Sequence, residues 1–215
     1  LREGAGLRYE FVGRQLFGFI KGTNWRLVEF RGSDIPEAVA EGDADLGFTS
    51  TDKALNQPDK EFDENGDFKR IDVVRELDYG GCEYRAGYTK RSGYSEDDTL
   101  EVAEGLVVGV GLEYLAERIF RERGIKPADY IVRDGHVENT TIPPRGRAQL
   151  IVDIYETGDT MRDNQLVPAR EQLMLFQAIE IRRKGNLGRN LEEMIDRFNS
   201  RIAVALEHPG KWMRS

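Results

Sequence analysis

Cysteine and histidine are both scarce in this chain, and their scarcity excludes several kinds of site. The 215 residues include one cysteine, Cys82, and two histidines, His136 and His208. No disulfide can therefore form within the chain, and neither a cysteine metal cluster nor a histidine-rich zinc site is expected. Because disulfides are rare in the reducing cytoplasm, we expect the protein to be cytoplasmic.

Long apolar runs and an excess of positive charge are also absent. No apolar segment approaches the ~20 residues that a membrane-spanning helix needs, and the N-terminal LREGAGLRYEF has no charged-then-apolar signal segment. The formal net charge is -8, which argues against nonspecific nucleic-acid binding, since such binding depends on Lys and Arg neutralising phosphates. A small phosphorylated ligand needs only a local positive site and remains compatible with this charge.

What the chain does contain is an alternation of apolar runs and helical patterns. Its 39% hydrophobic and 33% charged residues suit a globular protein. Strand-like segments such as 106–110 alternate with segments of helical periodicity such as 111–123, which predicts an α/β architecture with mostly parallel sheets. The segment 191–206 follows a capping Asn190 with apolar residues at i, i+3 and i+4 spacing, so we predict a final amphipathic helix there.

Two segments suggest how the chain is divided into domains. Residues 89–98, TKRSGYSEDD, are polar and contain Gly and Ser, and the apolar run 173–181 is typical of a strand that crosses back. We therefore predict a discontinuous first domain of residues 1–88 and 178–215, into which a second α/β domain of residues 89–177 is inserted. This is the layout of a two-lobed, hinged clamp with its ligand in the cleft between the lobes.

The segment 150–161, LIVDIYETGDTM, is the main candidate for a ligand site. Its apolar start predicts a buried strand, which carries the acid Asp153 near its end and is followed by a small-residue turn from Thr157 to Thr160. Backbone N–H groups of such a turn can point at phosphate oxygens, a helix that begins there adds a favourable dipole, and the acid can accept hydrogen bonds from ribose hydroxyls. An ordinary buried strand with a capped turn is the alternative, and the segment alone leaves both open.

A second candidate loop follows the short apolar segment 44–48. It contains Thr49, Ser50, Thr51 and Asp52, a cluster of hydroxyls with one acid. Ligands of open α/β sheets bind beyond the carboxyl ends of strands, so one interpretation is a second ligand-contacting loop. The other is a polar N-cap for the next helix, and the two remain equally open.

Three motifs occur in order along the chain. They are DIPEAVAEGDADLGF at 34–48 with Asp52 behind it, GHVE at 135–138, and IVDIYETGDTMRDNQL at 151–166. In this order they resemble the ATP phosphoribosyltransferases, which catalyse the first step of histidine biosynthesis. Three ordered motifs are much more specific than any one of them alone.

The resemblance implies a two-lobed fold similar to type II periplasmic binding proteins. It also implies a glycosyltransferase that moves phosphoribose from phosphoribosyl diphosphate to N1 of ATP, with Mg²⁺ as cofactor and diphosphate as the leaving group. The regulatory domain of the family's long form has no counterpart in this sequence. The chain therefore resembles the short form, which implies a homo-oligomer that works with a separate regulatory subunit.

The resemblance further implies roles for particular residues. The phosphate-binding turn would consist of Glu156, Thr157, Gly158, Asp159 and Thr160. Asp153 and Glu138 would be the catalytic carboxylates, placed near the ribose or the magnesium diphosphate; the metal ligands themselves stay unidentified. Carboxylates tolerate positive charge that develops at the anomeric carbon, while Mg²⁺ and fixed donors stabilise the departing diphosphate.

The sequence departs from the family pattern at two places that keep a second function open. Asp159 puts a carboxylate inside a loop expected to bind an anion, and the family's Lys-Gly-Arg segment would precede Leu1. Arg162, Arg145 and Arg147 can offset phosphate charge, or they can be ordinary surface arginines. The alternative function is a non-catalytic module of the same fold that binds a nucleotide or a phosphorylated sugar.

Overall fold

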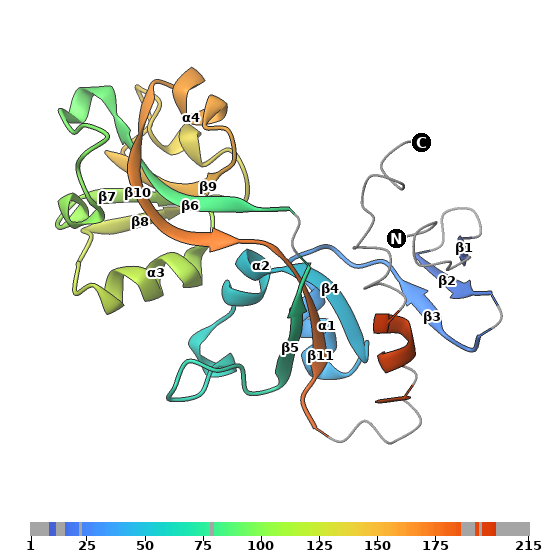
Figure 1. Ribbon diagram of the computed structural model, residues 1–215. Helices are drawn as coiled ribbons and strands as arrows, with labels where there is room; N and C mark the ends of the chain where they lie inside the picture. The colour runs from blue at the N-terminus through green and yellow to red at the C-terminus, as the bar shows by residue number, and fades with distance from the viewer. Residues whose placement is uncertain are drawn as a thin grey trace. The chain divides into compact units, whose positions relative to one another are not determined.

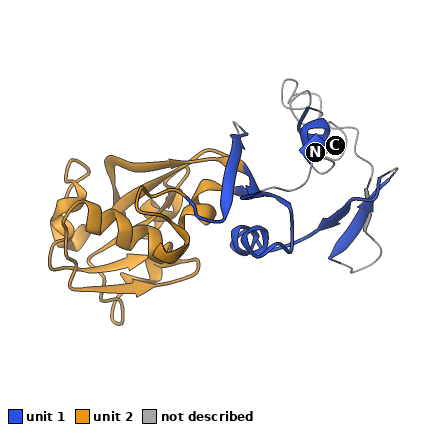
Figure 2. Ribbon diagram, turned by 90° about the horizontal axis from the view of Figure 1, so that it is seen from below, with its two compact units in different colours: residues 1–49, 68–77, 180–215 blue, residues 50–67, 78–179 orange. Residues whose placement is uncertain are grey.

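The computed structural model (Figure 1) describes residues 9–11, 16–21, 23–77, 80–185, 192–193 and 195–200. The chain forms two compact units, which Figure 2 shows in different colours. Unit 1 consists of Leu1–Thr49, Phe68–Leu77 and Glu180–Ser215, and unit 2 consists of Ser50–Asp67 and Asp78–Ile179. Each unit contains both sheet and helix, which confirms the predicted α/β class.

Unit 2 is built on a five-stranded sheet in the order β10-β6-β9-β7-β8. Its strands are β6 (Cys82–Thr89), β7 (Val107–Val110), β8 (Asp129–Val132), β9 (Leu150–Tyr155) and β10 (Leu166–Phe176). β7 pairs in parallel with both β8 and β9, as alternating strands and helices predict. β6 runs antiparallel to β9 and to β10, so the sheet is mixed.

Strand β9 shows why both faces of this sheet are covered. Leu150 and Val152 point into the larger apolar core, which also contains Leu115 and Phe120 of α3 (Glu113–Glu122). Ile151 points the other way, into a smaller cluster with Val137, Met161 and Leu166. Figure 1 shows α3 and α4 (Asp159–Asp163) on opposite sides of the sheet. A strand buried on both faces reads as a continuous apolar run, as 150–152 does.

Short helices complete unit 2. They are α2 (Thr51–Leu55), η1 (Asp59–Glu61), η2 (Lys90–Ser92), η3 (Leu100–Ala103) and η4 (Val137–Thr140). The Leu115 N–H donates to Asn56 Oδ1 over 3.2 Å, and Arg118 Nη2 donates to the Gln57 carbonyl over 3.1 Å. These bonds attach α2 and the residues behind it to α3.

Unit 1 contains two three-stranded sheets. One has the order β1-β2-β3 and consists of antiparallel pairs of Tyr9–Phe11, Phe17–Ile20 and Arg26–Val28. The other has the order β4-β11-β5 and consists of Leu46–Ser50, Ala178–Arg183 and Ile71–Glu76. Helix α1 (Ile35–Glu41) has Pro36 in its first turn and ends at Gly42, whose φ of 89° suits glycine.

The two units differ from the predicted domains in three segments. Residues 50–67, 78–88 and 178–179 belong to unit 2. The first two lie there because α2 is bonded to α3 and β6 pairs with β9 and β10. The polar segment 89–98 lies within unit 2. The predicted helix 191–206 falls outside the described residues except for 192–193 and 195–200. In the described part of the chain, every helix is too short or too polar to cross a membrane.

A glycine in β7 provides a test of this packing. A Cβ at Gly109 would lie 2.2 Å from Oγ1 of Thr140, a buried oxygen with no hydrogen-bond partner among the described residues. We expect Gly109→Ala to lower the free energy of unfolding by about 1–3 kcal/mol through overpacking, as measured by urea denaturation.

The matched control is Gly81→Ala, because the Cβ there would meet only the Phe176 carbonyl at 3.9 Å. Adding Thr140→Ala removes the colliding oxygen, so the double variant should recover most of the stability lost by Gly109→Ala. Equal losses in the single and double variants would contradict this packing.

Candidate functional site

Asp153 and Glu138 lie near one edge of the unit 2 sheet, and the 156–160 turn follows the strand that carries Asp153. β7 and β9 both end at this edge, and antiparallel β6 begins there, with Glu83 opposite Tyr155. Gly111 follows the end of β7, and the 156–160 turn follows β9. The carboxyl ends of parallel strands are the usual place for ligands in α/β sheets.

Asp153 packs against the backbone of Gly111 at this edge. A Cβ at Gly111 would be only 2.6 Å from Asp153 Oδ1, so the carboxylate occupies the space that a side chain would need. The pKa of Asp153 is raised to about 6. Burial is the main cause and the charge of Glu138 adds to it, while a hydrogen bond from the Ile154 backbone and the charge of Lys53 act in the opposite direction.

Glu138 is the second predicted carboxylate, and the structure brings it near the first. It lies on η4, is 7% exposed, and its charge acts on Asp153. Two carboxylates at a strand edge can share a hard divalent cation with oxygens from a ligand. Among the described residues, no group of three or more His, Cys, Asp or Glu side chains is arranged to hold a metal without such a ligand.

The turn after β9 has the shape that its glycine predicts. Gly158 has a φ of 76°, and a Cβ there would lie 2.4 Å from a ring carbon of Tyr155, so only glycine fits. Glu156, Thr157, Asp159 and Thr160 are all exposed. The turn that follows β9 therefore presents these polar side chains to solvent.

Asp159 does not turn away from the loop. Its Oδ2 accepts from the Thr157 hydroxyl over 2.8 Å, and its Oδ1 accepts from Arg162 Nη2 over 2.7 Å. These two hydrogen bonds lower the pKa of the Asp159 carboxyl below its ordinary value, and the bond from Arg162 has the larger effect. Of the three arginines noted in the sequence, Arg162 contacts this turn, whereas Arg147 lies 3.9 Å from Asp129.

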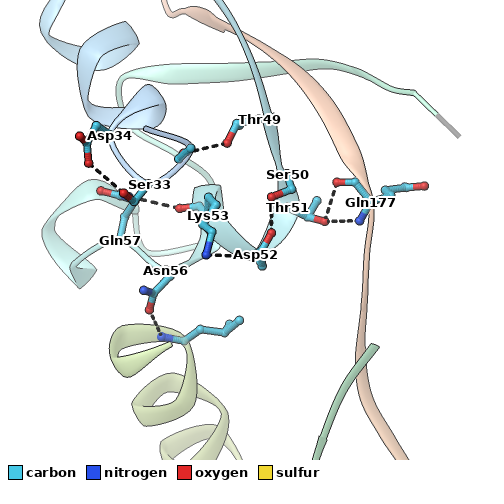
Figure 3. Close-up of polar contacts among 12 residues, drawn as sticks. Ser33, Asp34, Thr49, Ser50, Thr51, Asp52, Lys53, Asn56, Gln57 and Gln177 are labelled. Carbon is cyan, nitrogen blue, oxygen red and sulfur yellow. Dashed lines mark hydrogen bonds and ion pairs between the residues drawn. The ribbon is translucent and has the colours of Figure 1, made fainter. Parts of the chain in front are cut away.

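The second predicted loop is engaged in local contacts (Figure 3). The Thr49 hydroxyl, in unit 1, donates to the Gly32 carbonyl over 3.2 Å. In unit 2, the Ser50 hydroxyl donates to Asp52 Oδ1, and Lys53 Nζ lies 3.3 Å from the other oxygen of this buried acid. Ser50 is the N-cap residue of α2 by position, but its side chain makes no capping hydrogen bond and is bonded to the Asp52 carboxylate instead.

The sequence reasoning missed Lys53, and it gave Thr51 only as one hydroxyl of the loop, without its long-range contact. Lys53 carries a positive charge that lowers the pKa of Asp153. The Thr51 hydroxyl accepts from the Gln177 N–H over 2.8 Å and lies 3.1 Å from the Gln177 carbonyl, as Figure 3 shows. The adjacency of Lys53 to Asp52 was a usable signal, but the contact with Gln177 spans 126 positions and has none.

Solved structures define the class of fold. The chain superposes on a histidine kinase sensor domain with similarity to periplasmic binding proteins, with a TM-score of 0.54, 16% identity, and coverage of 85% of this chain and 75% of that one. The ATP phosphoribosyl transferase (HisG:HisZ) complex from Thermotoga maritima matches with a TM-score of 0.73 and 19% identity, covering 96% and 90%. These likenesses show a fold of the periplasmic-binding-protein type.

Sequence comparison then shows the family. The family model for ATP phosphoribosyltransferase matches residues 31–203. The ATP phosphoribosyltransferase of Nitratiruptor sp. is 30% identical over 165 residues, which are 75% of this chain and 69% of that protein. The Methanothermobacter thermautotrophicus enzyme of that name is 30% identical over 167 residues, and there the match spans 51% of its length. The chain belongs to the ATP phosphoribosyltransferase family, whose members are glycosyltransferases of the first step of histidine biosynthesis.

The raised pKa of Asp153 predicts a pH-dependent loss of stability. The unfolded chain ionises this group near its ordinary value of 3.8, but the folded chain does so only near 6. The folded state therefore binds more protons between these values, and stability falls as pH rises through them, by up to about 3 kcal/mol. Asp153→Asn should remove this contribution. The free energy of unfolding of the variant, measured by urea denaturation, should therefore rise relative to that of the parent between pH 4 and pH 7.5.

Asp129→Asn is the control, since Asp129 is an exposed acid of the same unit. Its stability should change with pH as the parent's does. If the stability of Asp153→Asn also changes with pH as the parent's does, the carboxyl of Asp153 does not titrate in the way its burial requires.

Proposed function

We propose that this chain binds phosphoribosyl diphosphate at the edge of the unit 2 sheet and transfers the phosphoribosyl group to N1 of ATP. One observation carries this proposal. Asp153 of β9 interacts with a second carboxylate, Glu138, and a glycine-containing hydroxyl turn directly follows β9, in a chain of the ATP phosphoribosyltransferase family.

The turn supplies donors for the 5′-phosphate. Thr157 and Thr160 are exposed, so their hydroxyls and backbone N–H groups can donate to a phosphate, whereas Gly158 is buried and the Asp159 N–H donates to the Thr157 hydroxyl over 3.4 Å. Hydrogen bonds between such donors and an anionic oxygen are about twice as strong as neutral ones. The ring of Tyr155 packs on Gly158 and holds the turn in shape.

The carboxylates fit a magnesium ion in the form that phosphate enzymes use. Mg²⁺ is normally bound by one or two carboxylates together with phosphate oxygens and waters. Asp153 and Glu138 provide such a pair, and a nearby cation favours the ionised form of a carboxyl whose pKa is raised to about 6. When bound, the metal would neutralise charge on the departing diphosphate.

The remaining chemistry requires no nucleophile from the protein. As the bond to diphosphate breaks, positive charge develops at the anomeric carbon of the ribose, and the carboxylate of Asp153 stabilises it through space. The protein's task is to hold N1 of the adenine in line with this carbon and to exclude water. Thr49, Ser50 and Asp52 would form the second ligand-contacting loop for this arrangement.

A second candidate function is supported by the contacts of Asp159. The Thr157 hydroxyl and Arg162 are already bonded to the Asp159 carboxylate, as expected for a loop that has drifted from its catalytic role. A module of the same fold would then bind a nucleotide or phosphosugar without turnover. Release of diphosphate from a mixture of ATP and phosphoribosyl diphosphate, measured with a coupled phosphatase, distinguishes the enzyme from the module.

The family also suggests how the protein works in the cell. A solved relative is titled a HisG:HisZ complex, which supports a partnership with a separate regulatory subunit. A homo-oligomer and a cytoplasmic location complete the proposal, in keeping with a biosynthetic enzyme that uses ATP and phosphoribosyl diphosphate.

Titration calorimetry tests the binding step. The protein should bind phosphoribosyl diphosphate in the presence of Mg²⁺, and chelation of the metal should weaken that binding. Thr160→Ala, Thr157→Ala and Asp153→Asn should each weaken it by about 10- to 100-fold, because a hydrogen bond to a charged group contributes about 1.5–3 kcal/mol.

Thr99→Ala serves as the control, since Thr99 is an exposed threonine of unit 2 that precedes η3. This variant should bind like the parent. Absence of any binding by the parent, or equal binding by all four variants, would rule out this site.

A further inference from the structure

Both oxygens of the Asp159 carboxylate are occupied by groups of its own loop. Oδ2 accepts from the Thr157 hydroxyl over 2.8 Å, and Oδ1 accepts from Arg162 Nη2 over 2.7 Å. Both side chains of the ion pair are exposed, with 51% of Arg162 and 71% of Asp159 accessible. The carboxylate is therefore an anion lying on the polar face of the turn, reachable from solvent.

The donors that Asp159 engages are few and specific. A threonine hydroxyl has a single O–H to donate, so while Thr157 donates to Asp159 it has none left for a ligand. Arg162 Nη2 has two N–H groups, and they go to Asp159 Oδ1 and, over 2.6 Å, to the Thr157 carbonyl. The carboxylate and the proposed ligand phosphate are both anionic acceptors that seek charge-assisted hydrogen bonds.

Arg162 has further contacts that hold it against the turn. It donates to the Thr157 carbonyl over 2.6 Å, and hydrogen bonds with Asp159 and Tyr155 raise its pKa. Tyr155 in turn packs on Gly158 and lies under the guanidinium of Arg85, 4.7 Å from its ring centre. The position of Arg162 therefore follows from its contacts with the turn itself as well as from Asp159.

We propose that Arg162 is a phosphate-binding residue of this turn and that the Asp159 carboxylate competes with the phosphate for Arg162 and for the Thr157 hydroxyl. This inference rests on the proposed function, since it concerns the same site. It makes Asp159 a determinant of affinity: binding of the 5′-phosphate requires the carboxylate to release both donors. The chain would thus bind its phosphorylated substrate more weakly than the same turn without the Asp159 carboxylate.

Titration calorimetry with phosphoribosyl diphosphate and Mg²⁺, and separately with inorganic phosphate, tests the competition. Asp159→Asn keeps the size of the side chain and removes its charge. We expect both ligands to bind about tenfold more tightly to this variant, because one unit of negative charge leaves the neighbourhood of the phosphate in a water-exposed site. Asp159→Asn/Arg162→Met should then bind about tenfold more weakly than Asp159→Asn, because the freed guanidinium is lost.

A matched pair elsewhere in unit 2 provides the control. Arg170 Nη1 donates to Asp97 Oδ1 over 2.6 Å in another exposed ion pair. Asp97→Asn and Arg170→Met should leave both affinities unchanged. Arg162→Lys in the Asp159→Asn background should recover part of the loss, because lysine keeps the charge but not the fork of donors.

The outcomes separate this inference from the proposed function. If the parent binds and Asp159→Asn binds equally or more weakly, the carboxylate does not compete and the inference is wrong. If Asp159→Asn/Arg162→Met binds as tightly as Asp159→Asn, Arg162 is not a phosphate ligand and the inference is also wrong. If neither the parent nor Asp159→Asn binds either ligand, the proposed function fails and this inference falls with it.

Discussion

Strand β9 is the constraint on which the site depends. It lies in the middle of the unit 2 sheet, antiparallel to β6 and parallel to β7, and both of its faces are covered. Because successive side chains of a strand point to opposite faces, Leu150 and Val152 fill one core while Ile151, Asp153 and Tyr155 share the other face. The acid is thus directed to the side where η4 and the 156–160 turn lie, and a shift of one residue would bury it in the large core.

Two glycines make this placement sterically feasible. Gly111 leaves room for the Asp153 carboxylate, and Gly158 leaves room for the Tyr155 ring, with Cβ distances of 2.6 Å and 2.4 Å at which a side chain would collide. This position disfavours the charged form of Asp153, since burial, with the charge of Glu138 adding to it, raises its pKa to about 6. Such a carboxyl gains from a cation, and Lys53 only partly supplies one, which is consistent with a site that a divalent metal completes.

Local patterns were a good guide to some elements and not to others. Helix α3 and strand β7 were predictable because periodicity and apolar runs are local properties, and residues 111–123 and 106–110 show them plainly. The segments 50–67 and 78–88 were placed in the other domain, because no local signal says that β6 pairs with β10 or that Asn56 accepts from Leu115. Pairing between distant segments is decided by the whole core.

The sequence by itself determined the family and the α/β class, through three ordered motifs that end in the turn at 157–160, and it determined that Gly158 and the acid Asp153 belong to one strand and turn. Only the tertiary structure decided that the charge of Lys53 acts on Asp153, that Thr51 bonds to Gln177, and that the Asp159 carboxylate accepts from Thr157 and Arg162. The physical reason is that a motif specifies which groups are present along the backbone. The partner of a charged side chain is the oppositely charged or hydrogen-bonding group that packing brings within about 3 Å.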